Sequence, residues 1–269
     1  SLWARAYGAW NDHDGDKNAP GYSEDQFGIL FGGDYSFDEN WFAGLAGGYF
    51  NSDMDFDDWG VRAGSKGDYD GWQIAGYGGY DNSVYYARGV ISYGNYDGSM
   101  NRLIQYGSTP VDPSSSISSD TLSVYGETGY RFMMSEGVGL APFVGLGYAT
   151  ADLDGFTEKD PEGTGAALTV HGSDAESLYL RVGGRLSGNM AMAGGLFAPE
   201  LAVAWEHEFK DTTQSVDMSF AAAPDGADFT VVSARTPRDS VLVDAGGKFM
   251  VSQSFDLGVY YSGRFNDVY

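Results

Sequence analysis

Apolar and polar residues alternate with period two along nearly the whole 269-residue chain, and no stretch has the spacing of an amphipathic helix. In QFGILFGGDYSF, the apolar residues Phe27, Ile29 and Phe31 share one parity. Gln26 and Asp34 lie on the other parity. Because successive side chains of a strand point to opposite faces, this alternation predicts strands with one apolar face and one polar face.

The alternation predicts eleven strands that cover most of the chain: residues 2–11, 22–36, 41–52, 69–80, 84–97, 120–132, 139–151, 175–187, 195–209, 239–250 and 255–265. Short links such as SFDEN, DNS and VSQS follow even-numbered strands. Long polar links, including residues 98–119 and 210–238, follow odd-numbered strands. No break in composition divides the chain, so residues 1–269 are predicted to form a single domain.

Three features favour a membrane barrel over a soluble sheet. The predicted strands match the ~9–11 residues that a tilted strand needs to cross a bilayer, and they exceed the ~5–6 residues common in soluble sheets. Short links at one rim and long loops at the other are typical of outer-membrane barrels. Aromatic residues near strand ends suit an interfacial girdle, and they pair as Tyr35 with Phe37, Tyr80 with Tyr85, and Tyr130 with Phe132. A soluble eleven-strand sandwich is the alternative.

The stretch SLYLRVGGRLSG shows what each face of such a barrel would contact. Leu178, Leu180 and Val182 share one parity and are predicted to face lipid. Arg181 and Arg185 lie on the other parity and are predicted to face a hydrated lumen. The barrel must be closed, because an open sheet edge in hydrocarbon leaves unpaired backbone groups that each cost several kcal/mol.

The same parity argument predicts a lumen-facing network of charged residues, for which the sequence specifies no pairing: Arg5, Arg88, Glu127, Arg131, Arg181, Arg185, Glu200, Asp244, Lys248 and Arg264. Further acidic residues of this parity are Asp34, Glu206 and Asp256.

A barrel of eleven strands is unexpected, because bacterial single-chain barrels have an even number of strands. The sequence stops at RFNDVY, shortly after the eleventh predicted strand. We therefore expect an all-β, antiparallel transmembrane barrel of twelve strands, with about eleven in this chain and the final strand missing from it. No leader sequence precedes the first strand, so a signal peptide is expected upstream of Ser1.

Composition narrows the function classes. The net charge is −23, with 38 acidic against 15 basic residues, and this disfavours a nucleic-acid partner, which needs a basic surface. The absence of cysteine excludes disulfides and cysteine metal sites. No apolar run approaches the ~18–20 residues of a membrane-spanning helix. We expect no cofactor.

Four segments resemble the C-terminal translocator domain of type Va autotransporters: LWARAYGAW at the start, PFVGLGYA at 142–149, PELAVAWEHEF at 199–209 and DLGVYYSGRF at 256–265. The resemblance runs from Leu2 to about Tyr269. The order and spacing of these segments are more specific than any one of them.

The resemblance implies a non-enzymatic, twelve-stranded barrel of the bacterial outer membrane, with its long loops outside the cell. Such a barrel anchors and exports an N-terminal passenger domain, and a linker helix before the first strand sits in the lumen. Its implied partners are outer-membrane lipid, its own passenger and linker helix, and the barrel-assembly machinery that reads the aromatic end of the final strand. Neither that final strand nor the linker helix is found in this sequence.

Two acidic segments are candidates for divalent-cation binding. Asp12, Asp14 and Asp16 alternate like the start of a calcium loop, but Lys17 and Ser23 stand where the EF-hand pattern requires Gly and Glu. The second segment is residues 51–60, which contains Asp53, Asp55, Asp57 and Asp58. Hydrated surface loops explain both segments more simply.

Two other functions stay open on the sequence alone. A general porin would need no passenger. A surface hydrolase barrel would need a histidine beside a nucleophile and an acid, and the chain offers only His13, His171 and His207. Strand alternation places His207 on the opposite face from its neighbours Glu206 and Glu208, which favours a position at the barrel rim.

Overall fold

The chain is described by a computed structural model, which describes residues 1–17, 19–57, 65–106, 109–192, 194–223, 226, 228–252 and 255–266. Asp58 of the second acidic segment and Tyr269 lie outside the described residues. Within them the chain contains no helix that is long and apolar enough to cross a membrane.

Eleven antiparallel strands form one continuous sheet in chain order, and each corresponds to a predicted strand: β1 (Leu2–His13), β2 (Tyr22–Ser36), β3 (Trp41–Phe56), β4 (Lys66–Asp81), β5 (Tyr85–Asn101), β8 (Ser114–Tyr130), β10 (Val138–Leu153), β13 (Ser173–Gly188), β15 (Gly195–Glu208), β18 (Asp239–Ser252) and β19 (Phe255–Phe265). Two short strands, β9 (Phe132–Ser135) and β14 (Met190–Met192), extend this sheet at its short turns. The all-β, antiparallel prediction is confirmed.

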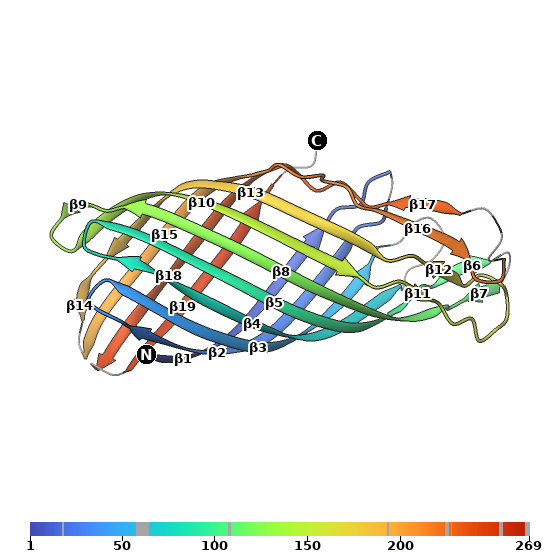
Figure 1. Cartoon of the computed structure of the whole chain (residues 1–269), viewed down its shortest axis with the longest axis horizontal. Coiled ribbons are helices and arrows are strands. Elements are labelled where there is room, and N and C mark those ends of the chain that lie inside the picture. Colours follow the sequence, from blue (N-terminus) through green and yellow to red (C-terminus); the bar gives the residue numbers. More distant parts are fainter. Residues whose placement is uncertain are drawn as a thin grey trace.

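The sheet is tilted and curls around a long axis, with the short turns at one end and the long loops at the other (Figure 1). Strands β1 and β19 form its two edges, and no ladder joins them within the described residues. The edges nevertheless approach each other, because the Arg5 guanidinium on β1 lies 5.7 Å from the centroid of the Tyr260 ring on β19.

The apolar parity of every strand lies on the convex outer face. Outer side chains at mid-strand are strongly exposed, as with Leu45 at 74% and Val259 at 77%. On the concave inner face, the buried side chains of Tyr86, Ala141, Phe143, Ala202 and Ala204 form a cluster. A soluble sandwich would bury its apolar parity against a second sheet. This inside-out arrangement therefore argues against the sandwich alternative.

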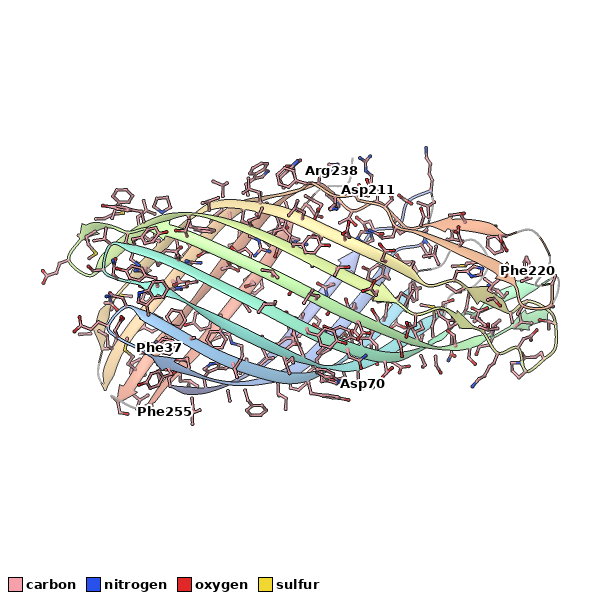
Figure 2. All side chains as sticks on the ribbon, viewed as in Figure 1. Phe37, Asp70, Asp211, Phe220, Arg238 and Phe255 are labelled. Carbon is pink, nitrogen blue, oxygen red and sulfur yellow. The ribbon has the colours of Figure 1, made fainter. Side chains whose placement is uncertain are left out.

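Aromatic side chains border the apolar outer face at both ends. At the short-turn end, Tyr35 contacts Phe37, Tyr80 contacts Tyr85, and Tyr130 contacts Phe132, with ring centroids 4.7–6.3 Å apart, which confirms the predicted pairs. Figure 2 shows Phe37 and Phe255 at this end and Phe220 at the opposite end.

At the loop end, an aromatic side chain donates a hydrogen bond to a carboxylate of the next strand at four places. The pairs are Tyr49 Oη to Asp70 (2.7 Å), Tyr93 Oη to Asp120 (2.6 Å), Tyr148 Oη to Glu176 (2.6 Å) and Trp205 Nε1 to Asp239 (2.9 Å). On β3, Trp41 and Tyr49 are eight residues apart. This spacing is about 27 Å along the strand and about 20 Å along the barrel axis at a tilt of ~40°, near the ~25 Å apolar band of such barrels.

The short turns owe their shape to single polar side chains. Asp38 Oδ1 accepts hydrogen bonds from the backbone N–H groups of Asn40 (2.7 Å) and Trp41 (2.8 Å). Asn82 Oδ1 accepts in the same way from Val84 (2.8 Å) and Tyr85 (2.6 Å). Asp and Asn favour such turns because their short side chains replace a backbone acceptor.

The long loops contain structure that the alternation did not predict. Several strands continue beyond their predicted ends, as β3 does to Phe56 and β8 does from Ser114, because backbone pairing continues where the outward positions are polar. A four-stranded sheet joins β11 (Phe156–Thr157), β12 (Leu168–Val170), β16 (Ser215–Phe220) and β17 (Phe229–Val232). A separate hairpin joins β6 (Ile104–Tyr106) and β7 (Thr109–Val111).

We call the described residues within 102–113, 154–172 and 209–238 the rim lobe, because their strands lie together at the loop end (Figure 1). A buried ion pair links two of its segments: Arg102 donates to both carboxylate oxygens of Glu158, at 2.8 and 2.6 Å. The backbone N–H of Leu168 donates to the same carboxylate at 2.8 Å. The three loops therefore form a packed unit.

Candidate functional site

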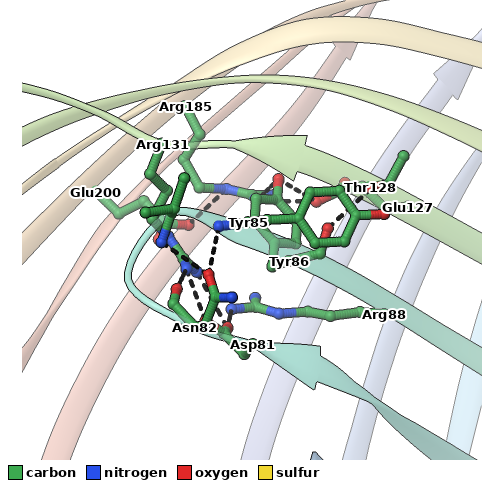
Figure 3. Close-up of polar contacts among 11 residues, drawn as sticks. Asp81, Asn82, Tyr85, Tyr86, Arg88, Glu127, Thr128, Arg131, Arg185 and Glu200 are labelled. Atoms are coloured by element: carbon green, nitrogen blue, oxygen red, sulfur yellow. Dashed lines mark hydrogen bonds and ion pairs between the residues drawn. The ribbon is translucent and has the colours of Figure 1, made fainter. Parts of the chain in front are cut away.

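The inner face of the sheet carries the predicted charged residues, and Tyr86 of β5 is the centre of its largest cluster (Figure 3). Tyr86 is 1% exposed. Its hydroxyl donates to Glu127 Oε1 at 2.8 Å and accepts from Arg185 Nη1 at 2.7 Å. Arg185 Nη1 also donates to Glu127 Oε1 at 2.9 Å. A tyrosine thus joins the opposite charges of two strands that are not neighbours in the sheet.

Two further arginines surround the same ring. The guanidinium carbons of Arg88 and Arg131 both lie 4.9 Å from the centroid of Tyr86. Asp81 bridges them: it accepts from Arg131 at 2.6 and 3.0 Å, and it pairs with Arg88. Stacking on the negative face of an aromatic ring stabilises a guanidinium whose charge is already partly neutralised by a carboxylate.

Small residues of β10 allow Arg185 of β13 to reach Glu127 of β8 across the intervening strand. Glu127 of β8 and Arg185 of β13 lie on either side of β10, where their nearest partners are Gly145 and Ala141. Arg185 passes over the ring of Phe143, 5.1 Å from its centroid. Phe143 lies between the small inward residues Ala141 and Gly145, which leave space for the arginine.

Arg185 also faces Glu200 of β15, with Nε 3.2 Å from Oε1. This contact lacks hydrogen-bond geometry, since Nε is buried without a hydrogen-bond partner. The pair is therefore a Coulombic contact only.

A second cluster lies on β13, β15 and β19. Glu206 accepts from Arg181 Nε at 2.6 Å through one oxygen, and Arg264 Nη2 lies 2.8 Å from the other. The Arg181 guanidinium lies over the rings of Tyr125 (5.2 Å) and Tyr179 (4.7 Å). Both oxygens of Glu206 are engaged by cations, so the carboxylate is arranged as a structural counter-ion rather than as a general base.

The remaining predicted residues make smaller contacts. Lys248 pairs with Asp256 at 3.0 Å, and Asp244 accepts from Ser262 at 2.6 Å rather than from a cation. Arg5 contacts only the Tyr260 ring among the described interactions. Sequence reasoning missed Asp81, Tyr86 and Tyr125. One sequence signal could have identified Tyr86: it is a tyrosine of the inward parity, and the residue opposite it on the next predicted strand is Gly129.

That pairing yields a testable prediction, Gly129→Ala. A Cβ atom at Gly129 would lie 2.4 Å from Cε1 of Tyr86, so the ring would have to leave the arginine cluster. We expect a loss of about 1–3 kcal/mol in the free energy of unfolding. Gly126→Ala on the same strand is the matched control, because its Cβ would meet nothing closer than 3.9 Å. Urea titration of both variants in lipid vesicles checks this, and equal stability would contradict it.

Nearer the long loops, the inner face of β1–β5 and β8 carries aromatic and small polar side chains. It contains a cavity of about 510 Å³ lined by Tyr7, Phe50, Tyr69 and Tyr96, among others. The Phe50 ring lies 6.2 Å from the Tyr69 ring and 4.9 Å from the Tyr96 ring. The Tyr86 cluster lies on β4, β5 and β8 of this same wall, nearer the short turns, whereas the Glu206 cluster lies on β13, β15 and β19.

The three histidines are far apart in the fold. His13 contacts the Tyr22 ring at the end of β1, and the backbone of His171 in the rim lobe bonds to Asp217. His207 lies on the outer face, with Nδ1 2.8 Å from Asp239 and its ring stacked on Trp205. In the part of the chain that the structure describes, no three His, Asp or Glu side chains are grouped to hold a metal ion.

Curated relatives share sequence with this chain over most of its length. It is 23% identical over 263 residues to the extracellular serine protease of Serratia marcescens, covering 98% of this chain and 24% of the relative. It is 26% identical over 237 residues to esterase EstA of Pseudomonas aeruginosa, covering 85% of this chain and 34% of the relative. The chain thus spans about a quarter to a third of the length of these relatives.

Solved structures share the fold. The translocator domain of the autotransporter NalP from Neisseria meningitidis matches with a TM-score of 0.71 at 16% identity, covering 98% of this chain and 81% of that one. The transport unit of AIDA-I from Escherichia coli matches with a TM-score of 0.66 at 18% identity, covering 98% and 84%. The family model of the autotransporter beta-domain matches residues 2–262. The chain therefore belongs to the autotransporter beta-domain family.

Proposed function

We propose that this chain is an outer-membrane translocator barrel that anchors and exports an N-terminal passenger domain to the cell surface. The observation that supports it most strongly is the inside-out sheet, whose outer face is apolar between two aromatic borders and whose inner face carries paired charges. Beta-domains of this family are outer-membrane barrels that act with a passenger. The long loops and the rim lobe then lie outside the cell.

The two faces have separate roles in this proposal. The outer aliphatic rows contact lipid, and the aromatic borders lie at its two interfaces. The predicted lumen-facing residues, from Arg5 to Arg264, keep the inner wall hydrated. Because most of them already contact an opposite charge, a polypeptide can pass without having to neutralise an isolated buried charge.

Further partners follow from the same proposal. Lipid requires that the edges of β1 and β19 be paired, so a twelfth strand would complete the barrel between them, with the assembly machinery acting on its end. A linker helix preceding β1 would occupy the lumen after export. The aromatic cavity and the charged clusters would offer such a helix both apolar and polar contacts.

The barrel itself is proposed to have no catalytic activity. The relatives named as a protease and an esterase are three to four times longer than the stretch they share with this chain, so their activities need not belong to the barrel. The three separated histidines offer no arrangement of base and nucleophile within the described residues. All three should tolerate alanine without loss of export.

The decisive experiment compares the full-length protein with a version lacking residues 1–269, using protease accessibility of the passenger on intact cells. We expect accessible passenger only when the barrel is present, and unchanged accessibility in the triple variant His13→Ala, His171→Ala, His207→Ala. Surface passenger without the barrel would overturn the proposal. Steady conductance from the full-length protein, with no exported segment, would favour a porin.

A further inference from the structure

The carboxylates of the loop-end border on β3–β8 are bound only by neutral side chains. Asp70 accepts from the hydroxyl of Tyr49. Asp120 accepts from the hydroxyl of Tyr93 and from the side-chain amide of Asn95 at 3.0 Å. A phenol and an amide donate hydrogen bonds without neutralising charge, so this side of the border stays negative.

The outer face beyond this border carries more negative charge on the same strands. Residues opposite one another in an antiparallel pair point to the same side. The registers of β2–β5 therefore place further carboxylates on the outer face with Asp70: Asp25, Asp53, Asp55, Asp68 and Asp97. Lys66 is the one outward cation on the described residues of β2–β8, and it pairs with Asp55 at 2.8 Å.

On β13–β18, the carboxylates of the same border are paired with basic side chains. Glu176 Oε2 accepts from Lys210 Nζ at 2.6 Å. Asp239 Oδ1, which accepts from Trp205, also lies 2.8 Å from Nδ1 of His207. Negative charge is thus offset on this side of the barrel and not on the other.

Arg238 adds a second cation to this side. It directly precedes Asp239, and its side chain is exposed at the outer edge of the ribbon near Asp211 (Figure 2). Its Nη1 lies 3.2 Å from the backbone carbonyl oxygen of Glu208. An ammonium carries three N–H donors and a guanidinium five, so Lys210 and Arg238 can each donate to a further acceptor.

These cations lie next to the apolar band. The rings of Trp205, His207 and Phe209 follow one another along the outer face of β15 and just beyond it, with centroids 5.5 and 5.0 Å apart. On the short-turn side of this row, Val203 and Val241 are each 47% exposed on the outer face. A lipid whose acyl chains cover the apolar band would therefore bring its headgroup to the depth of the two cations.

We propose that Lys210 and Arg238 bind the phosphate group of an outer-leaflet lipid, whose acyl chains lie against the outer face of β13, β15 and β18. Ammonium and guanidinium groups form charge-assisted hydrogen bonds with phosphate, and the acidic side of the barrel repels the same group. The occupant rests on the proposed function, because the band must meet lipid. The barrel then has one side that retains phosphorylated lipids.

Lipid binding to the full-length protein in a non-ionic detergent tests this site. The probes are fluorescent bisphosphorylated lipid A and its dephosphorylated form, both in EDTA, which removes metal bridges between carboxylates and phosphate. We expect the phosphorylated lipid to bind at least about tenfold more tightly, and the double variant Lys210→Gln, Arg238→Gln to lose this preference. Lys66→Gln, which removes an outward cation on the acidic side, is the matched control and should keep it.

Several results would overturn the inference: equal binding of the two lipids, an unchanged preference in the double variant, or an equal loss in Lys66→Gln. Displacement of the lipid by millimolar inorganic phosphate alone would also overturn it, because the site would then need no lipid. Heat-dependent mobility in gel electrophoresis confirms that each variant is folded. Absence of passenger from the surface of cells with the unaltered protein would refute the proposed export function and leave this binding assay unaffected.

Removing a carboxylate from the site gives an effect of opposite sign. Glu176→Gln keeps an acceptor for Tyr148 and removes the negative charge beside Lys210. We expect the phosphorylated lipid to bind about threefold more tightly to this variant, the size of an exposed charge interaction. Weaker or unchanged binding would mean that Lys210 does not contact the phosphate.

Discussion

Replacing Arg185 with leucine should cost about 3–5 kcal/mol in the free energy of unfolding. The Glu127 side chain is only 10% exposed, and Arg185 is its cationic partner at 2.9 Å. Without the guanidinium, the carboxylate keeps only neutral donors, the hydroxyls of Tyr86 and Tyr125. A buried charge without a counter-charge must either stay ionised at high cost or take up a proton.

A double-mutant cycle separates this effect from the loss of packing. Arg185→Leu, Glu127→Leu and the double variant are compared by urea titration in lipid vesicles. We expect the double variant to be more stable than Arg185→Leu, because no unpaired charge remains. If the effects of the two substitutions simply added, the ion pair would not be the source of the stability. In the full-length protein, replacing both Arg181 and Arg185 with leucine should also slow passenger display, and normal display would argue against a role for this wall.

The second large effect is expected on the outer face, from Leu45→Arg. Leu45 is 74% exposed and lies midway between Trp41 and Tyr49 on β3. An arginine at the middle of the apolar band of a membrane barrel costs about 2–4 kcal/mol, and the cost falls to about 0–1 kcal/mol near the interface. In a water-exposed sheet the same substitution would be nearly neutral.

Asn51→Arg is the matched control for this prediction. Asn51 lies on the same strand and the same face, two residues beyond Tyr49 towards the loop end. Unfolding free energies of both variants in lipid vesicles provide the measurement. A large loss for Leu45→Arg with little change for Asn51→Arg is expected. Equal small losses would mean that the band between the aromatic borders does not meet hydrocarbon.

The placement of function in this fold follows from its two outer borders. The aromatic pairs at the short-turn end and the aromatic–carboxylate pairs at the loop end define the band that the outer rows fill. Everything beyond the second border, including the rim lobe, then meets water on both faces. That position suits a packed lobe with a buried ion pair between Arg102 and Glu158.

How far the sequence could predict this structure depends on the range of the interactions. The strands could be read from the sequence because alternation is a local property: Phe27, Ile29 and Phe31 lie on one side of β2 whatever β2 pairs with. The same property placed Arg181 and Arg185 on the inner face. Strand ends were less predictable, since β3 continues to Phe56 after its apolar side chains give way to aspartates.

The candidate site was predicted in its composition and not in its contacts. Alternation identified Glu127 and Arg185 as inward residues, yet it could not show that they meet across β10. That meeting requires the small inward residues Ala141 and Gly145 and the particular register of three strands. Tyr86 was missed for the same reason, because an inward tyrosine becomes the centre of a cluster only when a glycine lies opposite it and arginines converge from other strands.

The sequence by itself determined the class of this protein: a membrane barrel of alternating strands, resembling an autotransporter translocator, with a charged interior and acidic outer loops. Local steric alternation and the cost of exposing backbone groups to lipid suffice for that conclusion. Only the tertiary structure decided which charges pair, and only it joined three distant loops into the rim lobe. Contacts such as Ser114 with Lys159 and Leu168 with Phe220 depend on the register of segments far apart in the chain, and no local pattern encodes that register.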